Sequence, residues 1–271
     1  MGKPHGQHHG RIRMADGALR GFGPGDLTPP FLKRRAILYV DGFNLFHALL
    51  DQRREWLWLD LQALGRGLVD PMERLASVVW VSAHRPQGKA RMEALFRYEA
   101  ALRARKVRCL MGHFVVHPEH CRRCGHSWSS ATEKQSDVNL ALAVAADVAA
   151  NRFDTAYLLT TDGDHAATAR FVREGYPHKR IVSVAPPGRV HNRQIAHWTD
   201  ELVGIGPNLL AQSMLPDRLK TAAGWVERPL AWSAAPSLPP PPDHPPPGPS
   251  TRPAPSLHET RAGHLTLVVS N

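Results

Sequence analysis

The chain contains little of what secreted and membrane proteins need. It has three cysteines, an odd number, and Cys121 and Cys124 are spaced C-x-x-C, so the disulfide framework of a secreted domain is not expected. No stretch approaches the ~18 uninterrupted apolar residues of a membrane span. The longest candidate, residues 140–150, is interrupted by Asp147, and no apolar signal segment lies near the start. These absences predict a soluble, cytoplasmic protein with no membrane partner.

The chain does have enough apolar sequence for a core, and it has an excess of positive charge. Hydrophobic residues make up 42% of it, and the net charge of +10 favours a polyanion as partner. Seven lysines and arginines, against two aspartates, lie in residues 1–35. Half of the excess charge therefore belongs to one end of the chain and says little about the folded part.

Both ends of the chain differ in composition from its middle. Residues 1–34 are polar, glycine-rich and basic, and we expect a disordered arm there. Residues 236–255 hold 11 of the 24 prolines, a composition that favours polyproline II and cannot build a core. We therefore expect a disordered Pro-rich tail over residues 216–271. It would serve as a linker or, alternatively, as a docking segment for an SH3-like protein partner.

Between these ends, residues 35–215 alternate strand signals with helix signals. Short apolar runs predict strands at residues 36–40, 77–83, 107–116, 155–160 and 180–184. Helical spacing predicts helices at residues 57–69, 88–106, 133–150 and 164–173. The alternation predicts an α/β fold with three layers, in which helices cover a doubly wound, mainly parallel sheet of about five strands.

Two of the predicted strands end at carboxylates. The first strand leads into Asp41, and the fourth leads into Asp162 and Asp164, while Asp137 lies one turn into the third helix. Ligands bind at the carboxyl ends of strands in open α/β sheets. Carboxylates gathered there repel one another unless a cation compensates their charge. The pattern therefore predicts a site for a divalent cation such as Mg²⁺ or Mn²⁺.

The order and spacing of these motifs resemble a known family. The motifs are Val40-Asp41-Gly42-Phe43-Asn44-Leu45, the helix start Glu133-Lys134-x-x-Asp137-Val138 and the turn Thr161-Asp162-Gly163-Asp164. Over roughly residues 36–205 they look like the NYN domain, LabA-like branch, of the PIN-like nuclease superfamily. The chain departs from that family at His165, where an aromatic or aliphatic residue is common.

The resemblance implies a PIN-like, Rossmann-like domain over residues 35–215 that cleaves RNA. By the same resemblance, Asp41, Asp137, Asp162 and Asp164 would ligate Mg²⁺ or Mn²⁺, and Asn44 would orient the site or a phosphate. In such a site the cation lowers the pKa of a bound water and neutralises a phosphate oxygen. We expect a metal-dependent ribonuclease.

Plainer interpretations exist for each motif. Asp41 suits a strand-end turn, Asn44 suits a helix cap, and residues 162–164 suit a solvated turn. Two other functions stay open as alternatives. One is an RNA-binding or adaptor protein with a silent site, and the other is a metal-dependent phosphatase.

A cysteine pair lies in a loop near residues 113–126. The C-x-x-C-G segment is half of a typical zinc site, to which Cys121 and Cys124 would contribute two thiolates. His113 and His117 are candidates for the other two ligands of a structural Zn²⁺. Redox use of the pair, or a loop without an ion, are the alternatives.

Basic residues beside the expected site are candidates for holding the RNA backbone. They are Lys134, Arg85, Lys89, Arg189 and Arg193. Lys134 is the strongest of them because it belongs to the helix-start motif, where it could pair with Asp137 or a phosphate. A run of charges is otherwise more often a solvated face.

Overall fold

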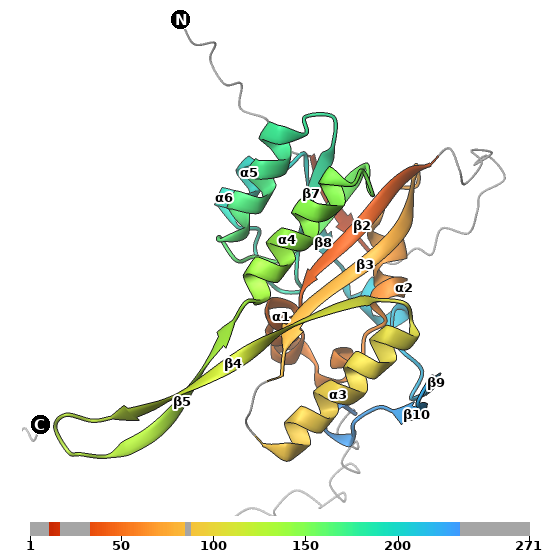
Figure 1. Ribbon diagram of the computed structural model, residues 1–271. Coiled ribbons are helices and arrows are strands. Elements are labelled where there is room, and N and C mark those ends of the chain that lie inside the picture. Colours follow the sequence, from red (N-terminus) through yellow and green to blue (C-terminus); the bar gives the residue numbers. More distant parts are fainter. Residues whose placement is uncertain (1–10, 17–32, 85–87, 234–271) are drawn as a thin grey trace, which may run out of the picture. The chain divides into compact units, whose positions relative to one another are not determined.

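The fold is built on an eight-stranded sheet. The computed structural model describes residues 11–16, 33–84 and 88–233 (Figure 1). The sheet order is β1-β8-β7-β6-β2-β3-β4-β5, and all neighbours are parallel except β4 and β5. The strands are β1 (Arg11–Ala15), β2 (Arg34–Asp41), β3 (Glu73–Ala83), β4 (Arg108–His120), β5 (Ser127–Lys134), β6 (Thr155–Leu159), β7 (Arg180–Ala185) and β8 (Glu201–Ile205).

Helices cover both faces of this sheet, so the domain has three layers. One face carries α1 (Gly42–Gln52), α2 (Leu61–Leu68), α3 (Lys89–Ala104) and α7 (Pro207–Gln212). The other carries α4 (Ser136–Ala149) and α5 (His165–Gly175). Alternate residues of β2 serve the two cores: Leu38 faces the first and Tyr39 the second. The short elements are the 3₁₀ turn η1 (Arg54–Leu57) and the helix α6 (Arg193–His197).

The α/β fold and its mainly parallel sheet are confirmed, but the number of strands was predicted too low. The five predicted strands correspond to β2, β3, β4, β6 and β7. Strands β1, β5 and β8 were not predicted. Two of these three, β1 and β5, are the edge strands, which are short or polar and lack the apolar runs of a buried parallel strand.

The prediction of a disordered arm is wrong for residues 11–16. They contain β1, which pairs with β8 in register from Arg11 opposite Glu201. Arg13 anchors the strand, because its Nε donates to Glu201 Oε1 at 2.8 Å and its Nη2 donates to the carbonyl of Leu68 at 2.8 Å. The rest of the expected arm, residues 1–10 and 17–32, lies outside the described residues.

The prediction of a disordered tail is likewise wrong for residues 216–233. They form the hairpin β9 (Arg218–Thr221) and β10 (Gly224–Glu227), followed by the 3₁₀ turn η2 (Leu230–Trp232). Trp232 is 7% exposed and packs on the rings of Tyr98 and Trp58 in the first core. The domain therefore continues past residue 215. The proline cluster itself lies outside the described residues.

The third predicted helix begins later than expected. Glu133 and Lys134 end β5, and α4 starts at Ser136, because β4 runs on to His120 and returns as a hairpin. Gln135 joins strand to helix with φ +80°, the left-handed region that few side chains adopt. Glu133 Oε1 accepts hydrogen bonds from the Ser136 N–H at 3.0 Å and its hydroxyl at 2.6 Å, which fixes the start of α4.

The chain reverses its direction of winding at β2. Strands β3 and β4 follow on one side of it, and β6, β7 and β8 follow on the other (Figure 1). The carboxyl ends of β2 and β6 are therefore neighbours at a topological switch point. Such a point is where open α/β sheets bind ligands.

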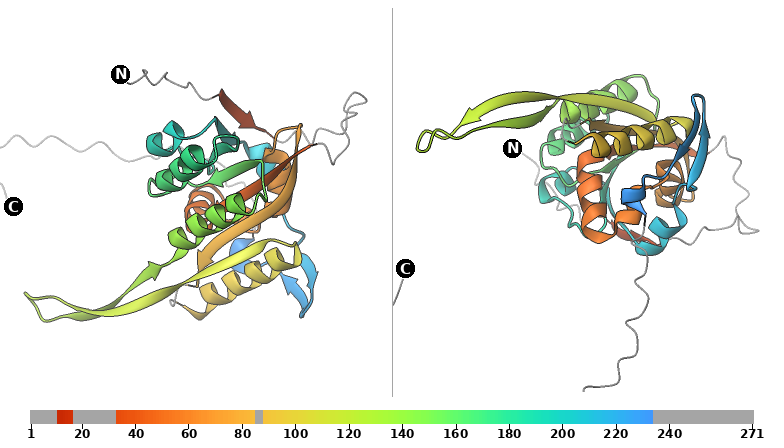
Figure 2. Two further views of the ribbon diagram at one scale, coloured as in Figure 1. Left: turned by 45° about the horizontal axis from the view of Figure 1, so that its top comes forward. Right: turned by 90° about the horizontal axis from the view of Figure 1, so that it is seen from below.

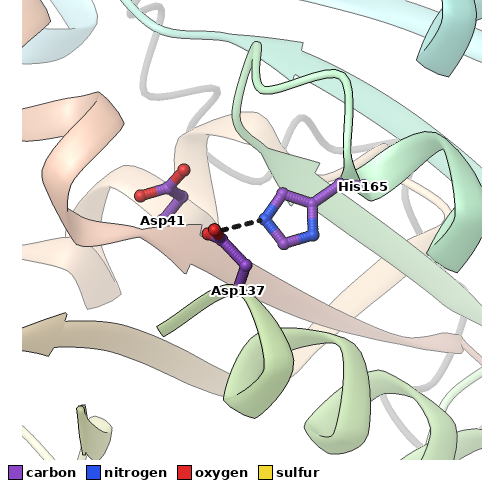
Figure 3. Close-up of side chains that lie close together, drawn as sticks. All are labelled: Asp41, Asp137 and His165. Atoms are coloured by element: carbon purple, nitrogen blue, oxygen red, sulfur yellow. Dashed lines mark ion pairs between the residues drawn. The ribbon is translucent and has the colours of Figure 1, made fainter. Parts of the chain in front are cut away.

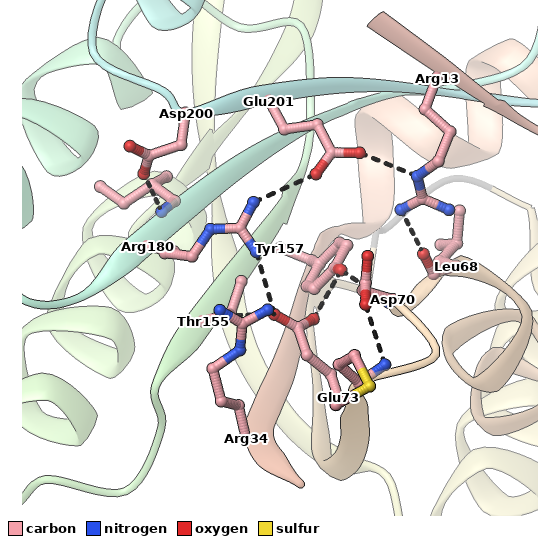
Figure 4. Close-up of polar contacts among 12 residues, drawn as sticks. Arg13, Arg34, Leu68, Asp70, Glu73, Thr155, Tyr157, Arg180, Asp200 and Glu201 are labelled. Carbon is pink, nitrogen blue, oxygen red and sulfur yellow. Dashed lines mark hydrogen bonds and ion pairs between the residues drawn. The ribbon is translucent and has the colours of Figure 1, made fainter. Parts of the chain in front are cut away.

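A buried ionic network closes the opposite, amino-terminal edge of the sheet (Figure 4). The carboxylate of Glu73, at the start of β3, accepts from Thr155 Oγ1 at 2.6 Å and from the Tyr157 hydroxyl at 2.7 Å. The guanidinium groups of Arg180 and Arg34 lie 3.3 Å and 3.4 Å from it. Arg180 continues to Glu201 of β8 at 3.3 Å, so one network joins five strands, β2, β3, β6, β7 and β8.

This network predicts which side chain at that edge carries stability. Glu73→Ala removes a fully buried carboxylate, leaves the hydroxyls of Thr155 and Tyr157 without their acceptor and takes one of two carboxylates from Arg180, so it should cost about 3 kcal/mol of unfolding free energy. Arg34 is 46% exposed, and Arg34→Ala should cost less than about 1 kcal/mol. Urea unfolding of both variants measures the two losses. Equal losses would contradict the assignment.

Candidate metal centre

Asp41 holds the central position at the carboxyl edge of the sheet. It ends β2, caps α1 and is 8% exposed. Its Oδ1 accepts from the backbone N–H of Asn44 at 3.0 Å, and its Oδ2 accepts from Thr160 Oγ1 at 2.9 Å. Burial raises the pKa of this carboxyl above its ordinary value, although both hydrogen bonds favour the ionised form. The carboxylate is fixed in position before any ligand binds.

Asp137 approaches Asp41 from the first turn of α4. Its side chain is 50% exposed and borders the cleft described below. Partial burial raises the pKa of Asp137, the imidazole of His165 opposes that rise, and the charges of Asp41 and Asp162 add to it. Carboxylates crowded in this way are relieved by a cation.

The third member of the group is His165, the first residue of α5. It is 1% exposed, and its Nε2 lies 3.6 Å from Asp137 Oδ1, too far for a hydrogen bond (Figure 3). This nitrogen is buried and has no hydrogen-bond partner among the described residues. Ligand atoms of Asp41, Asp137 and His165 all lie within 4.8 Å of one another. The three side chains form a group that could hold a metal ion.

The position of Asp164 differs from the prediction. Its side chain is exposed and does not line the cleft, and the neighbouring residue His165 occupies the inward position instead. The reason is local, because Asp162 Oδ1 accepts from the Asp164 N–H at 3.0 Å and folds residues 162–164 into a tight turn. A histidine directly after the second aspartate was the only sequence signal for this ligand.

Asn44 and Thr160 are not members of the group of candidate metal ligands, but their hydrogen bonds fix the segments around it. Asn44 Oδ1 accepts from both the N–H and the hydroxyl of Thr161, each at 3.1 Å, and so ties α1 to the loop after β6. Thr160 Oγ1 accepts from the Asp162 N–H at 3.0 Å while donating to Asp41. Thr160, which sequence reasoning missed, thereby links Asp41 to the Asp162 turn.

A cleft of about 560 Å³ opens over this group. Besides the two carboxylates, its lining includes Asp162, Glu133, Asn44 and Arg189. Of the five predicted RNA-binding residues, Arg189 alone is found in the lining, where it forms an ion pair with Asp51. Lys134 and Arg193 are exposed outside the lining, and within the described part of the chain Lys134 forms no ion pair with Asp137. Arg85 and the side chain of Lys89 lie outside the described residues.

An apolar pocket of about 330 Å³ adjoins the cleft. It lies between α1 and α3, and Phe43 and His47 of α1 line both cavities. Trp80, Tyr98 and Trp232 form much of its aromatic wall. These aromatic residues come from three separate parts of the sequence, so no local sequence pattern predicts the pocket.

The two histidines predicted as zinc ligands are not brought to the cysteine pair. His113 and Cys121 are separated by eight residues of extended strand, about 25 Å, and His117 is about 13 Å from the hairpin tip. His113 Nδ1 instead lies 3.2 Å from Gln135 Oε1 at the base of the hairpin. In the described residues, the single group of three or more candidate ligands is the one at Asp41. A zinc site made of Cys121, Cys124, His117 and His113 is therefore wrong.

Comparison with known proteins gives distant similarity. The chain is 25% identical over 251 residues to 6-hydroxy-3-succinoylpyridine 3-monooxygenase HspA from Pseudomonas putida, covering 75% of this chain and 77% of that protein. A crystal structure of a Vibrio parahaemolyticus protein of unknown function aligns with a TM-score of 0.45 and 15% identity, covering 69% of this chain and 100% of that one. No family model matches. Among the described helices, none has the length and hydropathy to cross a membrane.

The raised pKa of Asp41 predicts how stability depends on pH without metal. A carboxyl whose pKa is raised by folding destabilises the fold as pH rises above the ordinary range of aspartate, because it then ionises more readily in the unfolded chain. The metal-free Asp41→Asn variant should therefore melt at a higher temperature than the natural protein at pH 7. The difference should vanish as pH falls into the ordinary aspartate range. Asparagine keeps the oxygen that caps α1.

Adding Mn²⁺ should reverse this order. The natural protein should gain about 2.7 kcal/mol at 100 times its Kd, and the variant much less. Thermal melts at several pH values with and without Mn²⁺ measure both effects. If the metal-free variant were less stable at every pH, Asp41 would be a structural cap and no more.

Proposed function

We propose that this protein is a metal-dependent ribonuclease of the NYN, PIN-like type. The observation that carries the proposal is the convergence of Asp41, Asp137 and His165 beside the Asp162 turn at a topological switch point. An open cleft leads to this group, as a polymeric substrate requires. The sequence resemblance and the excess of basic residues agree with RNA as the substrate.

The side chains suit a divalent cation. Two carboxylates lie within reach of one another, and the buried Nε2 of His165 has no hydrogen-bond partner in the part of the chain that the structure describes. Carboxylate oxygens suit Mg²⁺ and Mn²⁺, whereas imidazole suits the later transition metals, so the mixed set favours Mn²⁺ over Mg²⁺. When bound, such an ion would lower the pKa of a water molecule and neutralise a phosphate oxygen.

The remaining polar groups would position the substrate. Arg189 borders the cleft and carries the positive charge that a phosphodiester needs. Asp162 borders the cleft opposite the cap of α1 and would accept a proton from the attacking water. Asn44 and Thr160 would keep Asp162 and Asp41 at a constant separation through the hydrogen bonds described above.

The first test is cleavage of mixed RNA by the full chain with Mn²⁺. Asp137→Asn should lower the rate at least about 100-fold, because a metal ligand contributes more than the groups around it. Asp164→Asn is the matched control, since it removes the same charge from an exposed side chain outside the cleft, and it should stay near the natural rate. EDTA should abolish cleavage. Equal loss in both variants would refute the ligand assignment.

A second test concerns the choice of metal. His165→Asn replaces the imidazole with a smaller oxygen-bearing side chain, so the Mn²⁺ concentration for half-maximal rate should rise about tenfold or more. The rate with Mg²⁺ should change less than the rate with Mn²⁺. An unchanged Mn²⁺ requirement would remove His165 from the metal centre.

The adjoining apolar pocket favours a second candidate, conversion of a small aromatic compound. The similar Pseudomonas putida protein is named for a pyridine substrate, and the pocket of about 330 Å³ is of a size that holds small molecules. Oxygen uptake with a hydroxypyridine and a reductant, without RNA cleavage, would favour this candidate. Release of phosphate from monoesters alone would favour a phosphatase, and RNA binding without cleavage an adaptor.

A further inference from the structure

The β4–β5 hairpin extends away from the other elements of the domain and ends in the cysteine pair (Figure 2). The tip is a tight turn: the Cys121 N–H donates to the carbonyl of His126 at 2.8 Å, and the Gly125 N–H donates to the carbonyl of Cys121 at 2.9 Å. Gly125 has φ +69°, which a glycine adopts without strain. The turn is therefore well defined although it is far from the core.

The turn brings its two thiols together. The sulfur of Cys121 accepts hydrogen bonds from the backbone N–H groups of Arg123 and Cys124 and interacts with the Cys124 thiol, which holds the pKa of Cys121 below its ordinary value. Neither thiol forms a disulfide. Two interacting sulfurs, one of which accepts backbone N–H groups, are half of a tetrahedral zinc site, which needs four ligands.

The described residues do not supply the other half. His117 is too far along β4, as described above. His120 and His126 flank the pair, and the ring of His126 stacks on Trp128, with centroids 6.1 Å apart and planes 18° apart. The described residues contain no group of three or more ligand atoms at this tip. The Cys121–Cys124 turn therefore provides two of the four ligands that a closed zinc site needs.

The hairpin also has the surface of an interface. Trp128, close to the tip, is 47% exposed. β5 is the edge strand of the sheet, so one row of its backbone groups has no strand partner. Each of these features would be satisfied by an identical hairpin related by a two-fold axis.

Charge is compatible with such a pairing. Arg122 and Arg123 lie between the cysteines, so each tip carries two positive charges beside its two thiolates. A zinc ion bound by four thiolates has a net charge of about −2, and the arginines of the two tips offset it. We propose that two copies of this chain share one Zn²⁺, held by Cys121 and Cys124 of each hairpin tip.

The test uses the full chain with a phosphine reductant, which excludes disulfide dimers. Zn²⁺ is titrated while molar mass is measured by light scattering, and bound zinc is measured by elemental analysis. A dimer with half an equivalent of zinc per chain is expected, returning to monomer with EDTA. Cys121→Ser should weaken the dimer at least about 100-fold and release the zinc, with an unchanged thermal melt because the tip lies outside the core.

Two further variants separate a shared site from a local one. Trp128→Ser should weaken the dimer about tenfold while leaving half an equivalent of zinc per chain at high protein concentration. His126→Ala should leave both dimer and zinc unchanged. A monomer with one zinc per chain, loss of zinc from His126→Ala, or a dimer indifferent to EDTA and to Cys121→Ser would each overturn the proposal.

Discussion

The pairing of β2 with parallel strands on both sides is the constraint on which this structure depends. A strand with neighbours on both edges and helices on both faces excludes water along its length, so its polar side chains must gather at its ends. At the amino edge, Glu73 and its arginines form a closed network. At the carboxyl edge, Asp41 accepts two hydrogen bonds, and no arginine or lysine of the described residues forms an ion pair with it. Both edges contain a buried carboxylate. The one at the amino edge is paired with arginines of the chain, and the one at the carboxyl edge is open to a ligand.

Asp41, the central residue of the candidate metal centre, has a second role in the fold. Asp41 caps α1 while facing the cleft, and Thr160 joins it to the Asp162 turn. Gly42 allows this arrangement, since a Cβ there would lie 2.5 Å from the carbonyl oxygen of Val81. Function and folding therefore rely on the same hydrogen bonds, and the repulsion between Asp41 and Asp137 persists in the fold because these bonds hold Asp41 in place.

Sequence reasoning found what local pattern determines. The uninterrupted apolar runs of β2 and β6 identified two central strands, and the aspartates after them identified the ligand-binding edge. It missed what distant contacts determine. β1 is held in the sheet by the hydrogen bond from Arg13 to Glu201, which is far along the chain. Trp232 is buried because it packs on the rings of Tyr98 and Trp58. Whether Asp164 or His165 points inward depends on how the turn at residues 162–164 is folded, and the spacing of residues does not determine that.

The junction between the hairpin and α4 gives the molecule a mechanical property. One residue, Gln135, separates the end of β5 from the helix that carries Asp137, and its backbone is in the left-handed region. So short a connection restricts how far β5 and α4 can move apart. At the hairpin base, the ring of Phe114 meets that of Phe43 edge-on, with centroids 6.0 Å apart, next to the cap of α1. The base of the hairpin therefore lies beside the helix starts that carry Asp41 and Asp137. A displacement of the hairpin base would therefore change the spacing between Asp137 and Asp41.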